Sequence, residues 1–343
     1  MKKLLSRLRL AAHVLRNGRS PVDDRAELQP ITQAEIAEIK AFFPMPKFFI
    51  FGHARSGTTL LARLVRIHPE VHCNWQAHFF TRPPLLRGLV ADQQVAAWLA
   101  RKSNRWNRGA NLSPIVLRAA ADFILERDAR LVGKKVVGDK SPNSLLDGQA
   151  VHELHTIYPD AKLVFIVRDG RDVLVSHRFQ NFIDAPEHLS KKDKAIRAAF
   201  GADSDEFLGG DSSVFTPKGI IQAANGWAQN VTETHQVARD LFPGQYLVLR
   251  FEDLLAKPIE QLAFLWEFLD VDPAGLADAV TAELSSNPDA DWQRSKAGEL
   301  VASLEKGKRG SWRDLFSDRD KQVFKENAGK SLIDWNYEKD LNW

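Results

Sequence analysis

The sequence predicts an α/β fold in which helices cover both faces of a central parallel sheet. Four short apolar runs bounded by turn residues are typical of buried strands; they span 47–51, 135–138, 163–167 and 246–251. Helical stretches follow these runs, and strands of this kind that alternate with helices form parallel sheets buried on both faces. A glycine-bounded loop joins the first strand to its helix. Together these observations predict a P-loop-like three-layer sandwich.

The helices are placed by the spacing of their apolar residues. Helical spacing begins at Thr58, and His68-Pro69 ends this helix. A second helix follows the third strand and extends to about residue 182. A third lies around 259–269, where leucine and tryptophan side chains recur at core spacing.

The composition indicates one large globular domain. The chain has 343 residues, of which 44% are hydrophobic and 27% charged, so it has ample material for a core. Residues 1–40 are polar and helix-prone, and Pro44 and Pro46 separate them from the rest. We therefore expect an N-terminal helical extension over 1–43 and a single domain over 44–343. The polar stretch near 183–218 predicts a surface insertion.

The loop after the first strand has the layout of a phosphate-binding loop. Gly52 and Gly57 let the backbone approach an anion, and the N–H groups that open the following helix point toward it. The glycine spacing is that of the nucleoside-triphosphate loop, but Thr58 stands where that loop has its lysine. The positive charge lies instead at Arg55, whose guanidinium forks onto two oxygens and keeps its proton. This favours an anion site other than that of an NTPase.

A second anion site is predicted after the strand at 163–167. Arg168 follows this strand directly, at the edge where parallel sheets bind ligands. Ser176 lies two helical turns further on, on a face that can turn back to the same point. Taken alone, Arg168 and Asp169 also fit a surface ion pair, but next to the first loop they predict a second phosphate site.

These two motifs resemble those of the PAPS-dependent sulfotransferase family. The segment 47–61 is similar to the family's loop for the 5′-phosphosulfate, and 165–176 to its segment for the 3′-phosphate. Residues 306–312 are similar to its basic glycine-containing segment, with Ser311 in place of an acidic residue. An arginine in the loop is closer to the tyrosylprotein, Golgi-type and bacterial branches than to the cytosolic small-phenol branch.

The resemblance implies a set of residues that bind PAPS. The 5′ end would be held by Arg55, Ser56, Gly57, Thr58 and Thr59. The 3′-phosphate would be held by Arg168 and Ser176, with Lys306 and Arg309 closing over it and Ser295 contacting the donor. Trp227 fits either a stacking partner of adenine or a core tryptophan. The resemblance implies no metal, and the ten histidines show no metal-binding spacing.

The chemistry is expected to depend on cations and a base. Arg55 is placed to stabilise the leaving phosphate, and Lys140, at another strand end, resembles a family lysine that contacts the transferring group. In the tyrosylprotein branch a glutamate serves as base, but the matching positions here are Trp75 and Gln76. The first candidate for the base is therefore His78, two residues further on, and His53 and Asp139 are its rivals.

The net charge and the cysteine content limit the partners and the compartment that the sequence predicts. A formal net charge of +3 is too small to indicate nucleic acid binding. Cys73 is the only cysteine, so no disulfide forms within the chain, and with no apparent signal sequence this predicts a cytoplasmic protein. The basic N-terminus predicts peripheral membrane contact at most.

The acceptor is open between a small molecule, a carbohydrate, a lipid and a peptide. We expect residues 75–130 and 183–218 to build its binding wall. Two rival functions are a P-loop kinase or NTPase without the usual lysine, and a non-catalytic binder of sulfated or phosphorylated ligands. The absent glutamate near Gln76 favours the binder, whereas two anion sites favour an enzyme.

Overall fold

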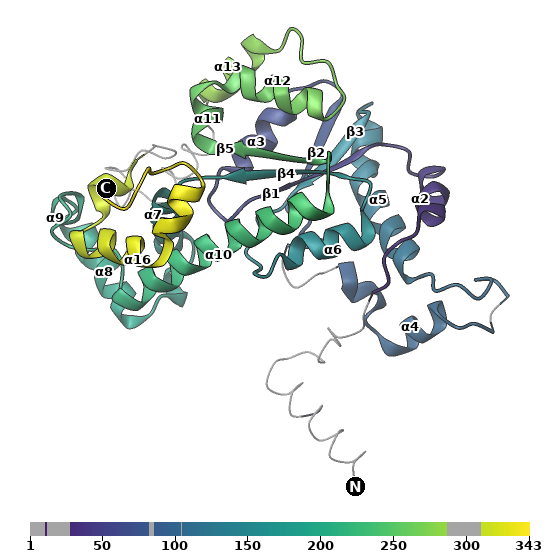
Figure 1. Cartoon of the computed structure of the whole chain (residues 1–343), viewed down its shortest axis with the longest axis horizontal. Helices are drawn as coiled ribbons and strands as arrows, with labels where there is room; N and C mark the ends of the chain where they lie inside the picture. Colours follow the sequence, from purple (N-terminus) through teal and green to yellow (C-terminus); the bar gives the residue numbers. More distant parts are fainter. Residues whose placement is uncertain (1–10, 12–27, 82–85, 104, 287–309) are drawn as a thin grey trace.

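A five-stranded parallel sheet forms the centre of the molecule (Figure 1). The computed structural model describes residues 11, 28–81, 86–103, 105–286 and 310–343. The strand order is β2-β3-β1-β4-β5. The strands are β1 (Lys47–Phe51), β2 (Val71–Trp75), β3 (Val136–Lys140), β4 (Lys162–Val167) and β5 (Tyr246–Arg250). With helices on both faces, this confirms the predicted α/β sandwich.

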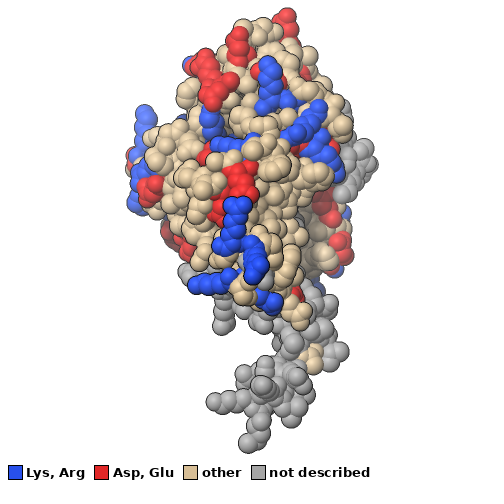
Figure 2. Space-filling view, turned by 90° about the vertical axis from the view of Figure 1, so that its right-hand side faces the viewer, with Lys and Arg blue, Asp and Glu red and all other residues tan. Residues whose placement is uncertain are grey.

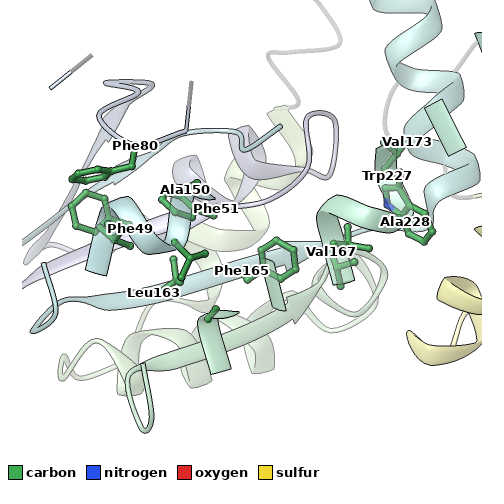
Figure 3. Packing of buried hydrophobic residues seen from close by; sticks show 14 of the residues in the cluster. Phe49, Phe51, Phe80, Ala150, Leu163, Phe165, Val167, Val173, Trp227 and Ala228 are labelled. Atoms are coloured by element: carbon green, nitrogen blue, oxygen red, sulfur yellow. The ribbon is translucent and has the colours of Figure 1, made fainter. Parts of the chain in front are cut away.

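The sheet is buried on both sides because alternate residues of β1 enter two different cores. Phe49 and Phe51 pack into one hydrophobic cluster, where Figure 3 shows Phe49 beside Phe80. Phe48 and Ile50 pack into the other cluster. Successive side chains of a strand point to opposite faces, so a continuous apolar run is what a two-sided burial requires.

Helices fill the two outer layers. The larger layer contains α5 (Ser113–Leu131), α6 (Gln149–Ile157), α7 (Gly170–Asp184), α10 (Pro217–Leu241) and α16 (Asp318–Asp334). The other contains α3 (Thr58–Val65), α11 (Phe251–Ala256), α12 (Pro258–Phe268) and α13 (Ala277–Ser286). The shorter described helices are α2 (Gln33–Lys40), η1 (Leu86–Val90), α4 (Gln93–Leu99), η2 (Pro186–His188), α8 (Lys191–Ala202), α9 (Asp205–Leu208) and α15 (Trp312–Leu315).

The sequence analysis missed strand β2. Val71 and Cys73 are buried, whereas His72 and Asn74 are only half-buried, because β2 lies at the edge of the sheet. An edge strand accepts polar residues on one face, which removes the apolar run that identified the other strands. Strand β3 also extends two residues further than predicted, to the buried Lys140.

The segment 183–218 is mostly helical and contributes to the core. Phe200 of α8 and Phe207 of α9 are buried, and the Phe200 ring lies 4.9 Å from that of Phe179 on α7. Of the expected N-terminal extension, the structure describes residue 11 and residues from 28 onward, including α2. None of the described helices is long and apolar enough to cross a membrane.

Candidate functional site

The loop between β1 and α3 depends on its two glycines. Gly57 has a φ of +90°, and a Cβ there would lie 2.2 Å from the Phe251 ring. A Cβ on Gly52 would lie 2.6 Å from the carbonyl oxygen of Ile166. Gly57 is also the N-cap of α3 and offers no side-chain oxygen to the first N–H groups of the helix. These N–H groups therefore remain available to an anion.

The two predicted anion motifs meet. Arg55 donates a hydrogen bond from Nε to Oγ of Ser176 at 3.1 Å. Arg168 donates from Nη1 to the carbonyl oxygen of Arg55 at 3.3 Å, and its guanidinium lies over the Phe251 ring. Arg168 is 6% exposed. Two guanidinium groups and a hydroxyl thus converge at the carboxyl ends of β1 and β4.

Ser56 adds a donor to this loop. Its side chain is fully buried, and its Oγ has no hydrogen-bond partner among the described residues. A buried hydroxyl without a partner is costly, so this atom fits the oxygen of a bound anion. The residues present therefore fit a phosphate or phosphosulfate group.

Residues 310–312 are hydrogen-bonded to Asp172, which lies in the second anion motif. The Asp172 carboxylate accepts hydrogen bonds from the backbone N–H of Gly310 at 2.8 Å and of Trp312 at 3.2 Å, and from Oγ of Ser311 at 3.0 Å. Asp172 is one helical turn after Arg168. The predicted donor-binding residues Ser295, Lys306 and Arg309 lie outside the described residues.

Lys140 reaches the start of α3 from the end of β3. It is fully buried, and its Nζ donates to Oγ1 of Thr59 at 3.3 Å. Its ammonium also lies 4.9 Å from the centre of the Trp75 ring. Lys140 therefore belongs to the same edge of the sheet as the Gly52–Gly57 loop.

Two of the candidate bases lie in a hydrogen-bonded cluster beside Lys140. Asp139 accepts from the backbone N–H of Ala77 at 3.0 Å and from Oγ of Ser141 at 2.5 Å, and burial raises its pKa to about 6. His78 is 7% exposed, and its Nδ1 lies 2.9 Å from Oγ1 of Thr81. Both side chains are thus held by neighbours.

The third candidate base, His53, faces a cavity. Its Nδ1 lies 2.9 Å from the carbonyl oxygen of Ala54, and burial lowers its pKa to about 4. The cavity has a volume of about 620 Å³ and is walled by the Gly52–Gly57 loop, α7, the start of α8 and the start of α10. His53 is the loop residue that contributes to its lining.

Sequence reasoning missed most of the cavity lining. His177 is near enough to Arg55 for the arginine's charge to lower its pKa, although burial is the larger cause. The α7 residues that line the cavity include Leu174, His177, Arg178 and Asn181. Their i, i+3, i+4, i+7 spacing is a signal available in the sequence. The sequence analysis did not recognise this signal because the residues of the opposite wall of the cavity lie some forty positions away in the sequence.

Trp227 is a core residue. Its side chain is fully buried, and a Cβ on Gly170 would lie 2.4 Å from its ring (Figure 3 shows it beside Val173). Of the two roles left open for this tryptophan, the structure supports packing between α7 and α10. Among the described residues there is no group of three or more His, Cys, Asp or Glu side chains suited to a metal.

Comparison with known proteins identifies a family model and relatives that match this chain. The family model described as "Sulfotransferase family" matches residues 46–274, well over half of the chain. The protein-tyrosine sulfotransferase of Drosophila melanogaster is 27% identical over 231 residues, which cover 66% of this chain and 38% of that protein. The chain thus spans well under half the length of this relative.

Two further matches extend over more of the chain. The nodulation protein NoeE of Sinorhizobium fredii is 25% identical over 321 residues, covering 87% of this chain and 68% of NoeE. The crystal structure of mouse sulfotransferase SULT7A1 complexed with PAP superposes with a TM-score of 0.45 at 14% identity, covering 91% of this chain and 94% of the mouse chain.

Proposed function

The chain belongs to the sulfotransferase family, and from this premise we propose that it transfers a sulfuryl group from PAPS to a hydroxyl or amine of an acceptor. The observation that carries the proposal is the meeting of Arg55, Ser176 and Arg168 at one edge of the sheet. A donor with two separate anionic groups needs two neighbouring anion-binding sites. The residues gathered at this edge of the sheet suit two such sites.

The residues that would hold PAPS follow from this geometry. The loop N–H groups, Ser56, Thr58 and Thr59 suit the phosphosulfate end, and Arg168 with Ser176 suits the 3′-phosphate. When bound, PAPS supplies the sulfuryl group and retains the leaving 5′-phosphate. Ser295, Lys306 and Arg309 stay proposed donor contacts, and the anchoring of Gly310 by Asp172 supports a third segment at this point.

Arg55 and Lys140 supply the cationic charge for the reaction. Both lie at the loop, and each is held by a hydroxyl, Arg55 by Ser176 and Lys140 by Thr59. Fixed cations stabilise charge that develops on equatorial and leaving oxygens without reorganising during the reaction. We therefore assign Arg55 to the leaving phosphate and Lys140 to the transferring group.

The acceptor enters through the cavity beside His53. A volume of about 620 Å³ suits a drug-sized molecule or the end of a larger one. The lining combines Phe215 with amide, imidazole and ammonium groups, including Gln222 and Lys218. This mixture suits an acceptor that carries hydroxyl groups on a partly apolar body.

His53 is our choice for the base. A hydrogen bond to the Ala54 carbonyl requires the proton on Nδ1, so Nε2 keeps its lone pair. With a pKa of about 4, the ring is neutral at pH 7 and able to accept the acceptor's proton. Unlike His53, neither His78 nor Asp139 is among the residues that line the cavity.

We also propose that the enzyme works in a reducing compartment such as the cytoplasm. Its single cysteine, Cys73, is buried, and burial raises the pKa of its thiol. A buried thiol with a raised pKa is unreactive and needs no oxidising environment.

The donor site is tested by ligand-induced stabilisation. We expect PAP to raise the melting temperature of the full chain much more than ATP with Mg²⁺ does, because a ligand that binds only the folded state stabilises it by mass action. Arg168→Ala should abolish the PAP shift, whereas Arg239→Ala, an exposed arginine on α10, should retain it. An equal or larger shift with ATP and Mg²⁺ would instead support a kinase.

Turnover separates an enzyme from a pure binder. Radiolabelled sulfate should pass from PAPS to members of a hydroxyl-bearing acceptor panel, and Arg55→Ala should abolish this transfer. A protein that binds PAP through Arg168 but transfers to no acceptor in any assay would be a binder.

A further inference from the structure

Helix α4 and the loop that follows it form an exposed surface that the proposed reaction does not use. We call it the Trp–Arg surface and define it by Val95, Trp98, Arg101, Lys102, Arg105, Trp106 and Arg108. All seven side chains are exposed. In Figure 1 this region projects at the lower right, away from the sheet.

The apolar part of this surface is continuous. The rings of Trp98 and Trp106 lie 4.7 Å apart at an angle of 32°, and they are 52% and 50% exposed. Val95, 37% exposed, precedes Trp98 by three residues and so shares its face of α4. Two half-exposed tryptophans in contact are unusual on a water-facing surface, where large apolar groups are normally scattered.

The charged side chains of the Trp–Arg surface are all positive. Arg101, Lys102, Arg105 and Arg108 lie within eight residues, and no Asp or Glu occurs between Asp92 and Asp122 in the sequence. Figure 2 shows Lys and Arg side chains gathered toward the lower end of this face, with few acidic side chains among them. Four neighbouring cations without acidic partners in this segment create a local positive potential.

Hydrogen bonds of a buried asparagine hold the loop that carries Trp106. Asn107 is 3% exposed, and its Nδ2 donates to the carbonyl oxygens of Leu99 at 3.2 Å and Arg101 at 3.1 Å. Its Oδ1 accepts from the backbone N–H of Gly109 at 3.0 Å. This buried amide ties the loop to the end of α4 and holds Trp106 against Trp98.

We propose that the Trp–Arg surface docks the protein on a membrane that contains anionic phospholipids. Tryptophan is favoured at the membrane–water interface, where its ring meets acyl chains and its N–H meets headgroups. Lysine and arginine beside it are attracted to anionic headgroups while their stems lie along apolar surface. An aliphatic Val95 next to the ring pair fits acyl chains.

A soluble acidic polymer fits this surface less well. The charged groups here only donate hydrogen bonds, and a saccharide site also needs acceptors for hydroxyl groups. Half-exposed Val95 contributes nothing to polar recognition of a sugar or an acidic peptide. The polymer is therefore an alternative that the experiment must separate.

The test compares vesicle binding of the full chain and two charge-matched variants. One variant replaces Arg101, Lys102, Arg105 and Arg108 with Gln. The control replaces Lys191, Lys192, Lys194 and Lys257 with Gln; these are exposed, and α8, which carries three of them, lies at the opposite end of the molecule in Figure 1. Both variants lose the same charge and keep the basic N-terminal sequence.

We expect cosedimentation with phosphatidylcholine–phosphatidylserine vesicles and little with pure phosphatidylcholine. The first variant should bind at least about tenfold more weakly, because it lacks four cations that anionic headgroups attract. The control variant should bind as the wild type does. Equal loss in both variants, or no loss in the first, would overturn the proposal.

A second readout addresses the tryptophans and the polymer alternative. Brominated phosphatidylcholine mixed with phosphatidylserine should quench tryptophan emission in the wild type, and Trp98→Phe with Trp106→Phe should remove most of this quenching while binding of PAP persists. Tight binding to dextran sulfate without any vesicle binding would show that the partner is a soluble polyanion and overturn the proposal.

Discussion

Arg55 in the first loop donates a hydrogen bond to Ser176 on α7, and this contact joins two motifs 121 positions apart in the chain. Both residues were predicted to bind opposite ends of the same donor. The bond orients the guanidinium before any ligand is present, and a group that is already oriented loses less conformational entropy on binding. This hydrogen bond therefore connects the Gly52–Gly57 loop directly to α7.

Removal of the Ser176 hydroxyl should weaken donor binding. We expect Ser176→Ala to raise the dissociation constant of PAP roughly tenfold to a hundredfold, because a hydrogen bond to a charged group contributes about 1.5–3 kcal/mol. Isothermal titration calorimetry measures this effect. Ser285→Ala on α13 is the control, since Ser285 bonds only within its helix. An unchanged PAP affinity in Ser176→Ala would contradict the assigned 3′-phosphate site.

A side chain at position 57 should deform the loop. In Gly57→Ala the Cβ would meet the Phe251 ring at 2.2 Å while φ is +90°, so we expect a loss of at least about 2 kcal/mol in the free energy of unfolding and loss of the PAP-induced thermal shift. Chemical denaturation and thermal shift measure the two effects. Gly88→Ala, where a Cβ meets nothing within 4 Å, should change neither.

The pH dependence of turnover should identify the base. Because burial lowers the pKa of His53 to about 4, the acidic limb of kcat/KM should appear near pH 4 rather than near 6.5. His53→Gln should reduce kcat/KM about a hundredfold at pH 7, within the range of general-base catalysis. Near-normal turnover in His53→Gln would exclude His53 as the base and return the role to Asp139 or His78.

Asp139 should make the stability of the protein fall as the pH rises. Its pKa is 3.8 in the unfolded chain and about 6 in the fold, so its carboxyl stabilises the fold fully below pH 4, and this stabilisation is lost as the pH rises through 6. Asn resembles the neutral carboxyl at every pH. The free energy of unfolding of Asp139→Asn, relative to wild type, should therefore increase by roughly 2 kcal/mol between pH 4 and pH 7.

Urea denaturation at several pH values measures this difference. The circular dichroism spectra of both proteins must match at each pH, so that the comparison concerns one native state. A difference that stays constant from pH 4 to pH 7 would show that the fold does not raise the pKa of Asp139.

Edge strands and long-range packing account for what the sequence analysis missed. Strand β2 escaped notice because half of its residues face away from the core. The sequence left two roles open for Trp227. The spacing of apolar residues around a helical tryptophan is the same whether its ring stacks on a ligand or packs on Gly170. Lys140 gave no sign of burial, since its charge is accommodated by Thr59 and Trp75 from other elements.

The sequence by itself determined the strands β1, β3, β4 and β5, the glycine loop and the two anion motifs. These features are local: an apolar run, a glycine where φ must be positive, and an arginine directly after a strand are visible within a few residues. The family resemblance also rested on such short segments, 47–61, 165–176 and 306–312.

Only the tertiary structure decided which side chains meet. It joined Arg55 to Ser176, anchored Gly310 on Asp172 and turned His53 toward the cavity. The reason is physical: these contacts connect residues on different elements, and their distances depend on how helices pack on the sheet. No periodicity in a single segment carries that information.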